Sequence, residues 1–231
     1  HPIALLSALK VYQQGHGERA MKRGNALSWA PVGEIVDALD EAFHLAFENI
    51  EPTGKKHLLA LDVSGSMTCG AIAGVPGLTP RVASSAMAMA TARVEKDFAA
   101  VGFTSGNGGA GTGLLPLSIT GKQRLDDVLK VVDNLPFGGT DCSLPMIWAK
   151  ENKVPVDTFV IYTDSETWAG KVHPFQALRD YREKMGRRAK LIVVGMTATK
   201  FTIADPSDPG MLDVVGFDTA APQVMADFAR G

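Results

Sequence analysis

Short apolar runs alternate with amphipathic segments along the chain from residue 57 onward. Each apolar run has the length of a strand, and each amphipathic segment has the spacing of a helix. Because strands that alternate with helices are joined by right-handed crossovers, the pattern predicts an α/β fold with a doubly wound, mostly parallel central sheet and helices on both faces. The predicted strands are 57–63, 97–103, 113–117, 157–163, 190–196 and 213–217, and the predicted helices are 80–96, 121–134, 143–152, 174–186 and 222–229.

Two of the predicted strands break the alternation, because only a glycine-rich loop separates 97–103 from 113–117. We therefore predict a hairpin with one antiparallel edge strand. The loop contains GNGGAG at 106–111, which formally matches the dinucleotide-binding pattern G-x-G-x-x-G. That pattern requires a helix directly after the glycines, whereas the apolar residues 114–117 indicate a strand. We interpret the glycines as a hairpin loop.

The residues before the first strand have helical spacing. Apolar positions recur along 2–14 and again within 31–50, which predicts two amphipathic helices. A basic connector separates them, and the stretch 15–31 is the one candidate boundary in the chain. We therefore predict a helical extension at 1–31 and an α/β domain at 32–231.

Composition and charge set only broad limits. A chain of 231 residues with 45% hydrophobic and 21% charged residues can form one substantial globular domain. A net charge of −2 gives no overall electrostatic reason to expect nucleic-acid binding. No apolar stretch approaches the roughly 20 residues that span a bilayer. The chain starts with His1-Pro2, without a basic leader, so we expect a cytoplasmic protein or a fragment of one.

The candidate chemistry lies at the end of HLLALDVSGSM, where a buried strand finishes in an acid and two hydroxyls. Asp62, Ser64 and Ser66 occupy alternating positions, and strand 157–163 likewise ends in an acid, Asp164. In a sheet of order 3-2-1-4-5-6 these two strands are neighbours, and ligands bind between their carboxyl ends. We expect Asp62 and Asp164 to face each other across that crevice.

Two buried carboxylates repel each other unless one is protonated or a cation lies between them. The nearby serine hydroxyls favour a cation, and the glycine turn in PFGGTDCSLP presents Thr140 as a fifth oxygen ligand. Donors that are all oxygen select a hard ion, Mg²⁺ first, with Mn²⁺ or Ca²⁺ as alternatives. The competing interpretation is a capped turn in which the hydroxyls bind helix amides. Asp141 and Glu166 adjoin these ligands and could support them from behind, but we interpret them as solvated loop acids.

Enzyme signatures do not fit this stretch. A nucleophile elbow requires G-x-S-x-G, but Asp62 occupies the position of the first glycine. No histidine pair has zinc-site spacing, and His173 before Pro174 is typical of a helix cap. The two cysteines, Cys69 and Cys142, are too few for a disulfide scaffold and are interpreted as incidental thiols, although a single bridge stays open. We predict that the domain is not an enzyme.

The combination of Asp62, Ser64 and Ser66 with Thr140 and Asp164 resembles the metal-ion-dependent adhesion site (MIDAS) of a von Willebrand factor A domain. The resemblance implies that the three hydroxyls contact the metal, while the two aspartates bind it directly or through water. It also implies one open coordination position for an acidic residue of a partner protein. The chain departs from many such domains in having Ser, not Gly, after Asp164.

EPTGKKHLLALDVSGSM, GGTDCSLPMIWA, VHPFQALRDYREKM, AKLIVVGMT and FTIADPSDPGMLDVVGFDT are similar, in that order, to the carboxy-terminal half of the Ro ribonucleoprotein family. By this resemblance 1–31 is the tail of a missing helical-repeat (TROVE) ring. The family binds small non-coding Y RNAs and misfolded RNA mainly through that ring, and acts in RNA quality control, in bacteria with exoribonucleases. We therefore predict a metal-dependent protein-interaction domain that binds RNA weakly by itself. A metal-dependent phosphoester hydrolase and a degenerate, purely structural A domain remain the alternatives.

Overall fold

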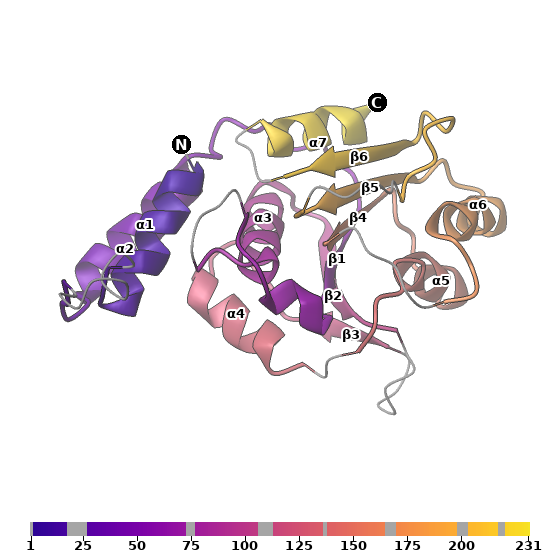
Figure 1. Cartoon of the computed structure of the whole chain (residues 1–231). Coiled ribbons are helices and arrows are strands. Elements are labelled where there is room, and N and C mark those ends of the chain that lie inside the picture. Colours follow the sequence, from indigo (N-terminus) through magenta and orange to yellow (C-terminus); the bar gives the residue numbers. More distant parts are fainter. Residues whose placement is uncertain are drawn as a thin grey trace.

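A six-stranded sheet in the order β3-β2-β1-β4-β5-β6 forms the centre of the molecule (Figure 1). The β2–β3 pair is antiparallel, and the other neighbouring pairs are parallel, which confirms the predicted doubly wound α/β fold and its hairpin. The computed structural model describes residues 2–17, 27–72, 77–105, 113–135, 138–164, 170–197, 203–216 and 220–231. The strands are β1 (His57–Asp62), β2 (Phe98–Phe103), β3 (Leu114–Leu117), β4 (Thr158–Thr163), β5 (Lys190–Gly195) and β6 (Met211–Val215).

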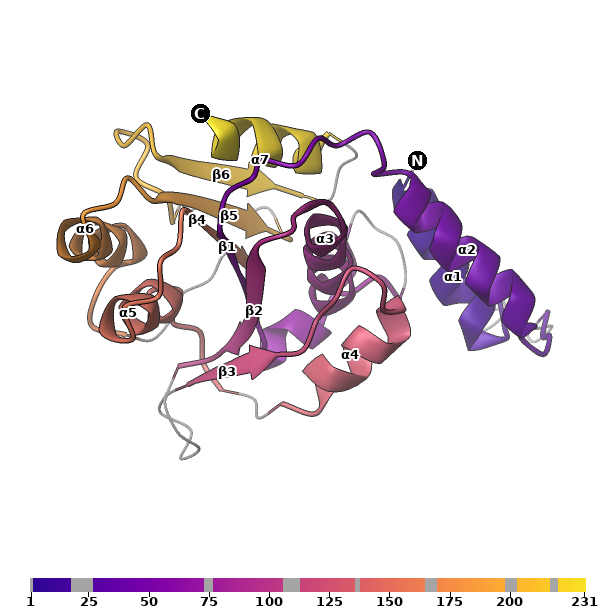
Figure 2. The same ribbon diagram turned by 180° about the vertical axis from the view of Figure 1, so that it is seen from behind.

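Helices cover both faces of the sheet, and a further helical pair lies outside one of them. Figures 1 and 2 show α3, α4 and α7 on one face, α5 and α6 on the other, and the pair α1–α2 beside α3 and α4. The helices are α1 (Pro2–Gln14), α2 (Gly33–Leu45), α3 (Pro80–Val94), α4 (Leu125–Asp133), α5 (Leu144–Glu151), α6 (Pro174–Met185) and α7 (Ala221–Arg230). The short 3₁₀ helix η2 (Gly65–Thr68) follows β1 and was not predicted.

The central position of β1 in the sheet explains why its sequence is apolar. All six of its residues are buried because β2 and β4 flank it and helices cover both of its faces. Leu59 and Leu61 belong to the hydrophobic core beneath α3, whereas Leu58 and Ala60 belong to the core beneath α5 and α6. A strand buried on both faces carries apolar side chains at consecutive positions, and this pattern is typical of parallel sheets.

Helix α3 is the most deeply buried helix that contacts β1. Thr79 caps its amino terminus by accepting a hydrogen bond from the Val82 amide at 3.3 Å, and Pro80 occupies its first position. Small residues along the helix let it lie close to the sheet on one side and to other helices on the other. The charged residue Arg81 is buried in its first turn.

One predicted strand needs adjustment near the carboxyl end of the chain. The strand predicted at 213–217 begins at Met211, because Met211 already pairs with Leu191 of β5. The helical pair packs onto the domain: Leu6, Leu9 and Phe43 are buried in the same core as α3.

The basic connector between α1 and α2 lies largely outside the described residues, as does the loop 106–111. No helix in the described part of the chain is long and apolar enough to cross a membrane.

Candidate metal centre

The carboxyl ends of β1 and β4 lie side by side at the edge of the sheet where the predicted ligands gather. Leu61 of β1 pairs with Tyr162 of β4, so that Asp62 and Asp164 leave the sheet from neighbouring strands. Asp62 is 1% exposed and Asp164 is 7% exposed. The two carboxylates interact electrostatically, since the charge of Asp164 raises the pKa of Asp62. Asp62 and Asp164 therefore lie at neighbouring strand ends, as the strand order predicts.

Asp62 makes hydrogen bonds through both of its carboxylate oxygens. Oδ1 accepts the Ser64 amide at 2.8 Å. Oδ2 accepts the Thr140 hydroxyl at 3.4 Å and the Thr163 hydroxyl at 2.8 Å. Burial nevertheless raises the pKa of Asp62 to about 6, against the opposing effect of the hydrogen bonds from Ser64 and Thr163. Burial disfavours the charged form of a carboxylate, and a bound cation would restore it.

The hydroxyls of Ser64 and Ser66 converge, with 3.1 Å between their Oγ atoms. The first turn of η2 brings them together: Ser64 precedes the helix in an extended conformation, and Ser66 lies within it. Ser64 is buried, whereas Ser66 is exposed. The pair of hydroxyls therefore reaches from the buried carboxylates to the protein surface, where a partner group could approach.

Thr140 reaches Asp62 from a loop between α4 and α5. The loop passes close to the end of β2, because a Cβ on Gly138 would lie 3.2 Å from the Cβ of Thr104, and the Gly139 amide donates to the Ser105 hydroxyl at 3.1 Å. Glycine at 138 thus permits a close approach that a side chain would crowd. Thr140 itself is 2% exposed. The structure brings Asp62 together with the hydroxyl of Thr140, as predicted.

Two residues that the sequence patterns did not indicate support this arrangement. Thr163, the last residue of β4, donates to Asp62. Arg81, which is 3% exposed, donates from its two terminal nitrogens to Asp133 at the end of α4 and to the carbonyls of Val63 and Ser64, at 3.0, 3.1 and 3.3 Å. A Thr-Asp pair at a strand end is the only sequence signal for Thr163. Nothing local signals Arg81, because its partners lie 17 to 52 residues away.

The prediction that Asp141 is a solvated loop acid is wrong. Asp141 is 6% exposed, and its Oδ1 accepts the Ser143 amide at 3.0 Å and the Ser143 hydroxyl at 2.5 Å. Helix α5 begins directly after Ser143, so Asp141 lies against the start of that helix. A sequence pattern cannot distinguish such a loop from an exposed one. Glu166 lies outside the described residues.

The remaining chemical candidates are settled more simply. Cys69 and Cys142 are both free thiols, the first exposed and the second buried, so the single bridge left open by the sequence is not formed. The predicted cap at His173 is confirmed, since its Nδ1 accepts the Phe175 amide at 3.4 Å. Among the described residues, no group of three or more His, Cys, Asp or Glu side chains could hold a metal ion. A cation at the carboxyl edge would therefore depend on hydroxyl ligands as well as the two aspartates.

The residues present fit a hard divalent cation. All of the donor atoms are oxygens, and the residues that carry them come from the ends of β1 and β4 and from two loops. Burial disfavours the charged form of one of these residues, Asp62. Hard cations such as Mg²⁺ prefer carboxylate, hydroxyl and water oxygen. The arrangement could hold such an ion, and Ser66 is its exposed member.

Comparison with known proteins identifies the family. A family model described as the Ro60 vWA domain matches residues 56–229 of this chain. The chain belongs to the Ro60 vWA domain family. It is 54% identical over 231 residues to the RNA-binding protein RO60 of Deinococcus radiodurans and 45% identical over 232 residues to the RNA-binding protein RO60 of Caenorhabditis elegans. The matches cover all of this Ro60 vWA chain but 41% and 34% of those two proteins, so the chain spans less than half the length of these relatives.

Solved structures agree with this assignment. The crystal structure of the Deinococcus radiodurans RO (RSR) protein matches with a TM-score of 0.80 and 53% identity, over 100% of this chain and 44% of that one. Proximal thread matrix protein 1 from the mussel byssus matches with a TM-score of 0.53 and 12% identity, over 78% of this chain and 49% of that one. At that identity the second match shows the A-domain fold alone.

Proposed function

We propose that this Ro60 vWA chain is a metal-dependent protein-interaction domain of a Ro-type RNA-binding protein. The observation that supports it is the buried Asp62 carboxylate, which lies beside Asp164 and accepts a hydrogen bond from Thr140 at the carboxyl edge of the sheet. Burying one charged carboxylate next to another costs free energy in the absence of a cation. If these carboxylates served only for packing, neutral side chains would fill the same space at a lower cost in folding free energy.

In this proposal Ser64, Ser66 and Thr140 contact the metal, and Asp62 and Asp164 bind it directly or through water. Mg²⁺ is the first candidate because every donor is oxygen, with Mn²⁺ and Ca²⁺ as alternatives. When bound, the ion supplies an open coordination position for the carboxylate of an acidic residue on a partner protein. A contact of this kind is sensitive to EDTA and less sensitive to salt than a surface ion pair.

For the longer protein we propose the RNA functions that the Ro resemblance implies: binding of Y RNA and misfolded RNA, in cytoplasmic RNA quality control with an exoribonuclease. The names of the two relatives support RNA binding, and this chain covers 41% and 34% of them. We place the RNA surface mainly outside this chain, whose net charge is −2. Tight binding of single-stranded RNA by this chain at physiological salt would contradict that placement.

Calorimetric titration with Mg²⁺ and Mn²⁺ tests the metal centre. The wild-type chain should bind one ion, and Thr140→Ala and Asp62→Asn should each weaken the affinity by at least about tenfold, since each removes an oxygen donor or a charge. Thr120→Ala is the matched control, because Thr120 is exposed and lies away from the carboxyl edge. An absence of binding to the wild type would overturn the proposal and leave a degenerate domain with a structural role.

A phosphodiesterase assay with the same ions tests the alternative from another class. We expect no turnover, because hydrolysis also requires a positioned base or an activated water. Turnover that depends on Mn²⁺ and disappears in the Asp62→Asn variant would favour a phosphoester hydrolase over the interaction domain.

A further inference from the structure

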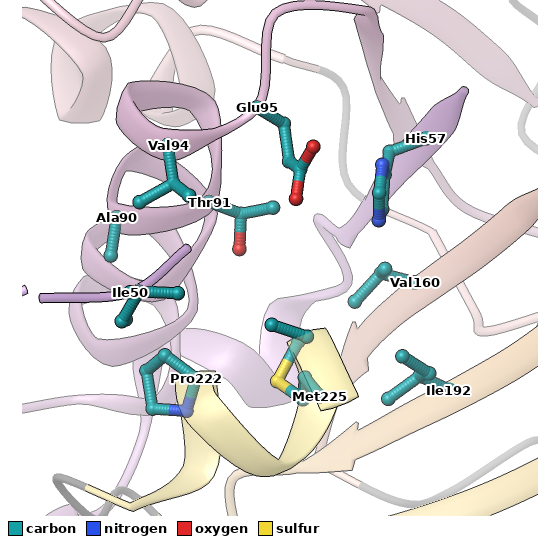
Figure 3. Close-up of a pocket in the computed structure, with 11 residues that line it drawn as sticks. Ile50, His57, Ala90, Thr91, Val94, Glu95, Val160, Ile192, Pro222 and Met225 are labelled. Carbon is teal, nitrogen blue, oxygen red and sulfur yellow. The ribbon is translucent and has the colours of Figure 1, made fainter. Parts of the chain in front are cut away.

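A cavity of about 20 Å³ lies away from the candidate metal centre, near the amino ends of the strands (Figure 3). It is lined by the end of α3, by β1, β4 and β5, by α7, and by Ile50 from the linker that joins α2 to β1. Most of the lining is apolar, and His57, Thr91 and Glu95 are the polar exceptions. A cavity of this volume has room for about one water molecule.

Glu95 directs a carboxylate oxygen into this cavity, where it meets no hydrogen-bond donor from the described residues. The residue is 5% exposed, and its Oε1 accepts the backbone amide of Thr53 at 2.8 Å. Its Oε2 is buried and has no hydrogen-bond partner among the described residues. Figure 3 shows the carboxylate directed from the end of α3 into the cavity. An unpaired buried acceptor is costly, and more so when it belongs to a charged group.

His57 presents a second acceptor from the opposite side. Its Nδ1 lies 3.0 Å from the Lys55 carbonyl, which can only accept, so Nδ1 carries the hydrogen. Burial lowers the pKa of His57, although Glu95 opposes this shift, and the lowered pKa favours the neutral ring. In that tautomer Nε2 has a lone pair and no hydrogen. Figure 3 shows the ring of His57 and the carboxylate of Glu95 facing each other across the cavity.

The unpaired buried oxygen Oε2 of Glu95 requires an occupant that donates a hydrogen, or else a cation, and Nε2 of His57 can accept a second hydrogen from the same occupant. A cation would have only these two strong ligands, and the apolar lining leaves no room for the waters that would complete its shell. The Thr91 hydroxyl is already engaged, since it lies 3.2 Å from both the Met87 carbonyl and the Tyr162 hydroxyl. A single water molecule satisfies both acceptors and fits the volume.

We propose that this cavity is a binding site for one water molecule, which donates one hydrogen to Glu95 Oε2 and the other to His57 Nε2. The bound water thereby fixes the carboxylate that binds the Thr53 amide, and so completes the attachment of the linker to the sheet. Two further contacts attach the same linker: Arg230 donates to the Glu51 carbonyl at 2.8 Å, and the Lys56 amide donates to Asp157 at 3.0 Å. The site therefore helps to set where the helical pair α1–α2 joins the domain.

A cavity-filling variant distinguishes a water-filled cavity from a dry one. Val160→Ile adds one methylene at a side chain that Figure 3 shows lining the cavity. Val193→Ile is the matched control, because Val193 is equally buried in β5 but belongs to the core on the other face. If the methylene displaces the water, the melting temperature should fall below that of the control by about 4 °C or more. A melting temperature equal to or above that of the control would mean a dry cavity and overturn the proposal.

Hydrogen exchange at the Thr53 amide tests the attachment of the linker. In Glu95→Leu the amide loses its acceptor and should exchange at least about tenfold faster than in the wild type. In Glu95→Gln the carboxamide can accept from Thr53 and donate into the cavity, so exchange should stay within about threefold. Glu51→Leu, an exposed position on the same linker, is the control. Equal exchange in Glu95→Leu and the wild type would contradict the proposed role.

A crystal structure of the wild type at high resolution identifies the occupant directly. Density for a water within about 3.2 Å of both Glu95 Oε2 and His57 Nε2 would support the proposal. An empty cavity, or an anomalous peak at the same position after a Zn²⁺ soak, would overturn it. None of these outcomes depends on whether the carboxyl edge binds a metal.

Discussion

The hydroxyl of Thr163 donates a hydrogen bond of 2.8 Å to Oδ2 of Asp62, and so joins the last residue of β4 to the last residue of β1. The bond fixes the orientation of the carboxylate on which the proposed metal centre depends. Thr163 was not a predicted ligand, yet it positions Asp62, which was.

Replacing Thr163 with valine should therefore alter Asp62 specifically. The pKa of Asp62 should rise above its value of about 6, because the hydrogen bond from Thr163 lowers it. At pH 7 in EDTA the free energy of unfolding should fall by about 1–3 kcal/mol, the usual cost of an unmade bond to a buried charged group. Carboxyl NMR titration and urea unfolding measure the two effects. Thr163→Ser retains the hydroxyl, and a pKa shift there as large as in the valine variant would contradict the explanation.

Arg81 should be essential to the shape of the loop after β1. Arg81→Met removes the contacts to Asp133 and to the Val63 and Ser64 carbonyls, and leaves buried acceptors unpaired. We expect the free energy of unfolding to fall by about 1–3 kcal/mol, because the Val63 and Ser64 carbonyls lose a charged donor, whereas the exposed Asp133 can bind water instead. Arg179→Met is the control: that arginine is half-exposed in its ion pair with Asp205, and its loss should cost less than about 1 kcal/mol. Equal losses in the two variants would show that burial of Arg81 matters little.

Gly170 should not tolerate a side chain. Its φ is +97°, and a Cβ there would lie 2.5 Å from Oδ2 of Asp141, whose carboxylate is tied to Ser143 and cannot easily move. At Gly186, where φ is +62° and no atom lies within 4 Å of the added Cβ, alanine should cost only about 1 kcal/mol of strain. Gly170→Ala should cost at least about 2 kcal/mol more, measured by urea unfolding. Similar losses at the two glycines would exclude a steric role for Asp141.

His44 should make the protein less stable in acid. It is 2% exposed, and burial, together with Arg93, lowers its pKa to about 4. Asp40 lies 3.6 Å from Nε2 but does not offset the burial, because burial also raises the pKa of Asp40. The unfolded chain binds a proton near pH 6.5 and the folded chain does not, so this contribution is complete above pH 6.5 and is lost as the pH falls toward 4.

The magnitude of this loss is up to about 3 kcal/mol, from the difference between the two pKa values. Urea unfolding at pH 7 and pH 4.5 measures it. In His44→Gln the part of the pH dependence that comes from this residue should disappear. If His44→Gln loses as much unfolding free energy between pH 7 and pH 4.5 as the wild type does, the loss comes from other groups.

The sequence by itself determined the α/β fold and the position of the chemistry along the chain. A strand that is buried on both faces is apolar at consecutive positions, as in 57–63, and strands that alternate with helices along the chain form a parallel sheet. Both features can be recognised from neighbouring residues in the sequence. The alternating Asp62, Ser64 and Ser66 are likewise local, because one turn brings them together. The same reasoning placed Asp164 at the end of the neighbouring strand.

Only the tertiary structure decided which groups support those residues. Arg81 is buried because its partners come from two separate segments, and no spacing in its own helix indicates them. Asp141 looked like a surface acid because burial depends on what packs over a loop rather than on its sequence. The facing acceptors of Glu95 and His57 belong to different elements, 38 residues apart, and meet only when α3 lies on the sheet. Hydrogen bonds between distant segments depend on the packing of whole elements, which local patterns do not encode.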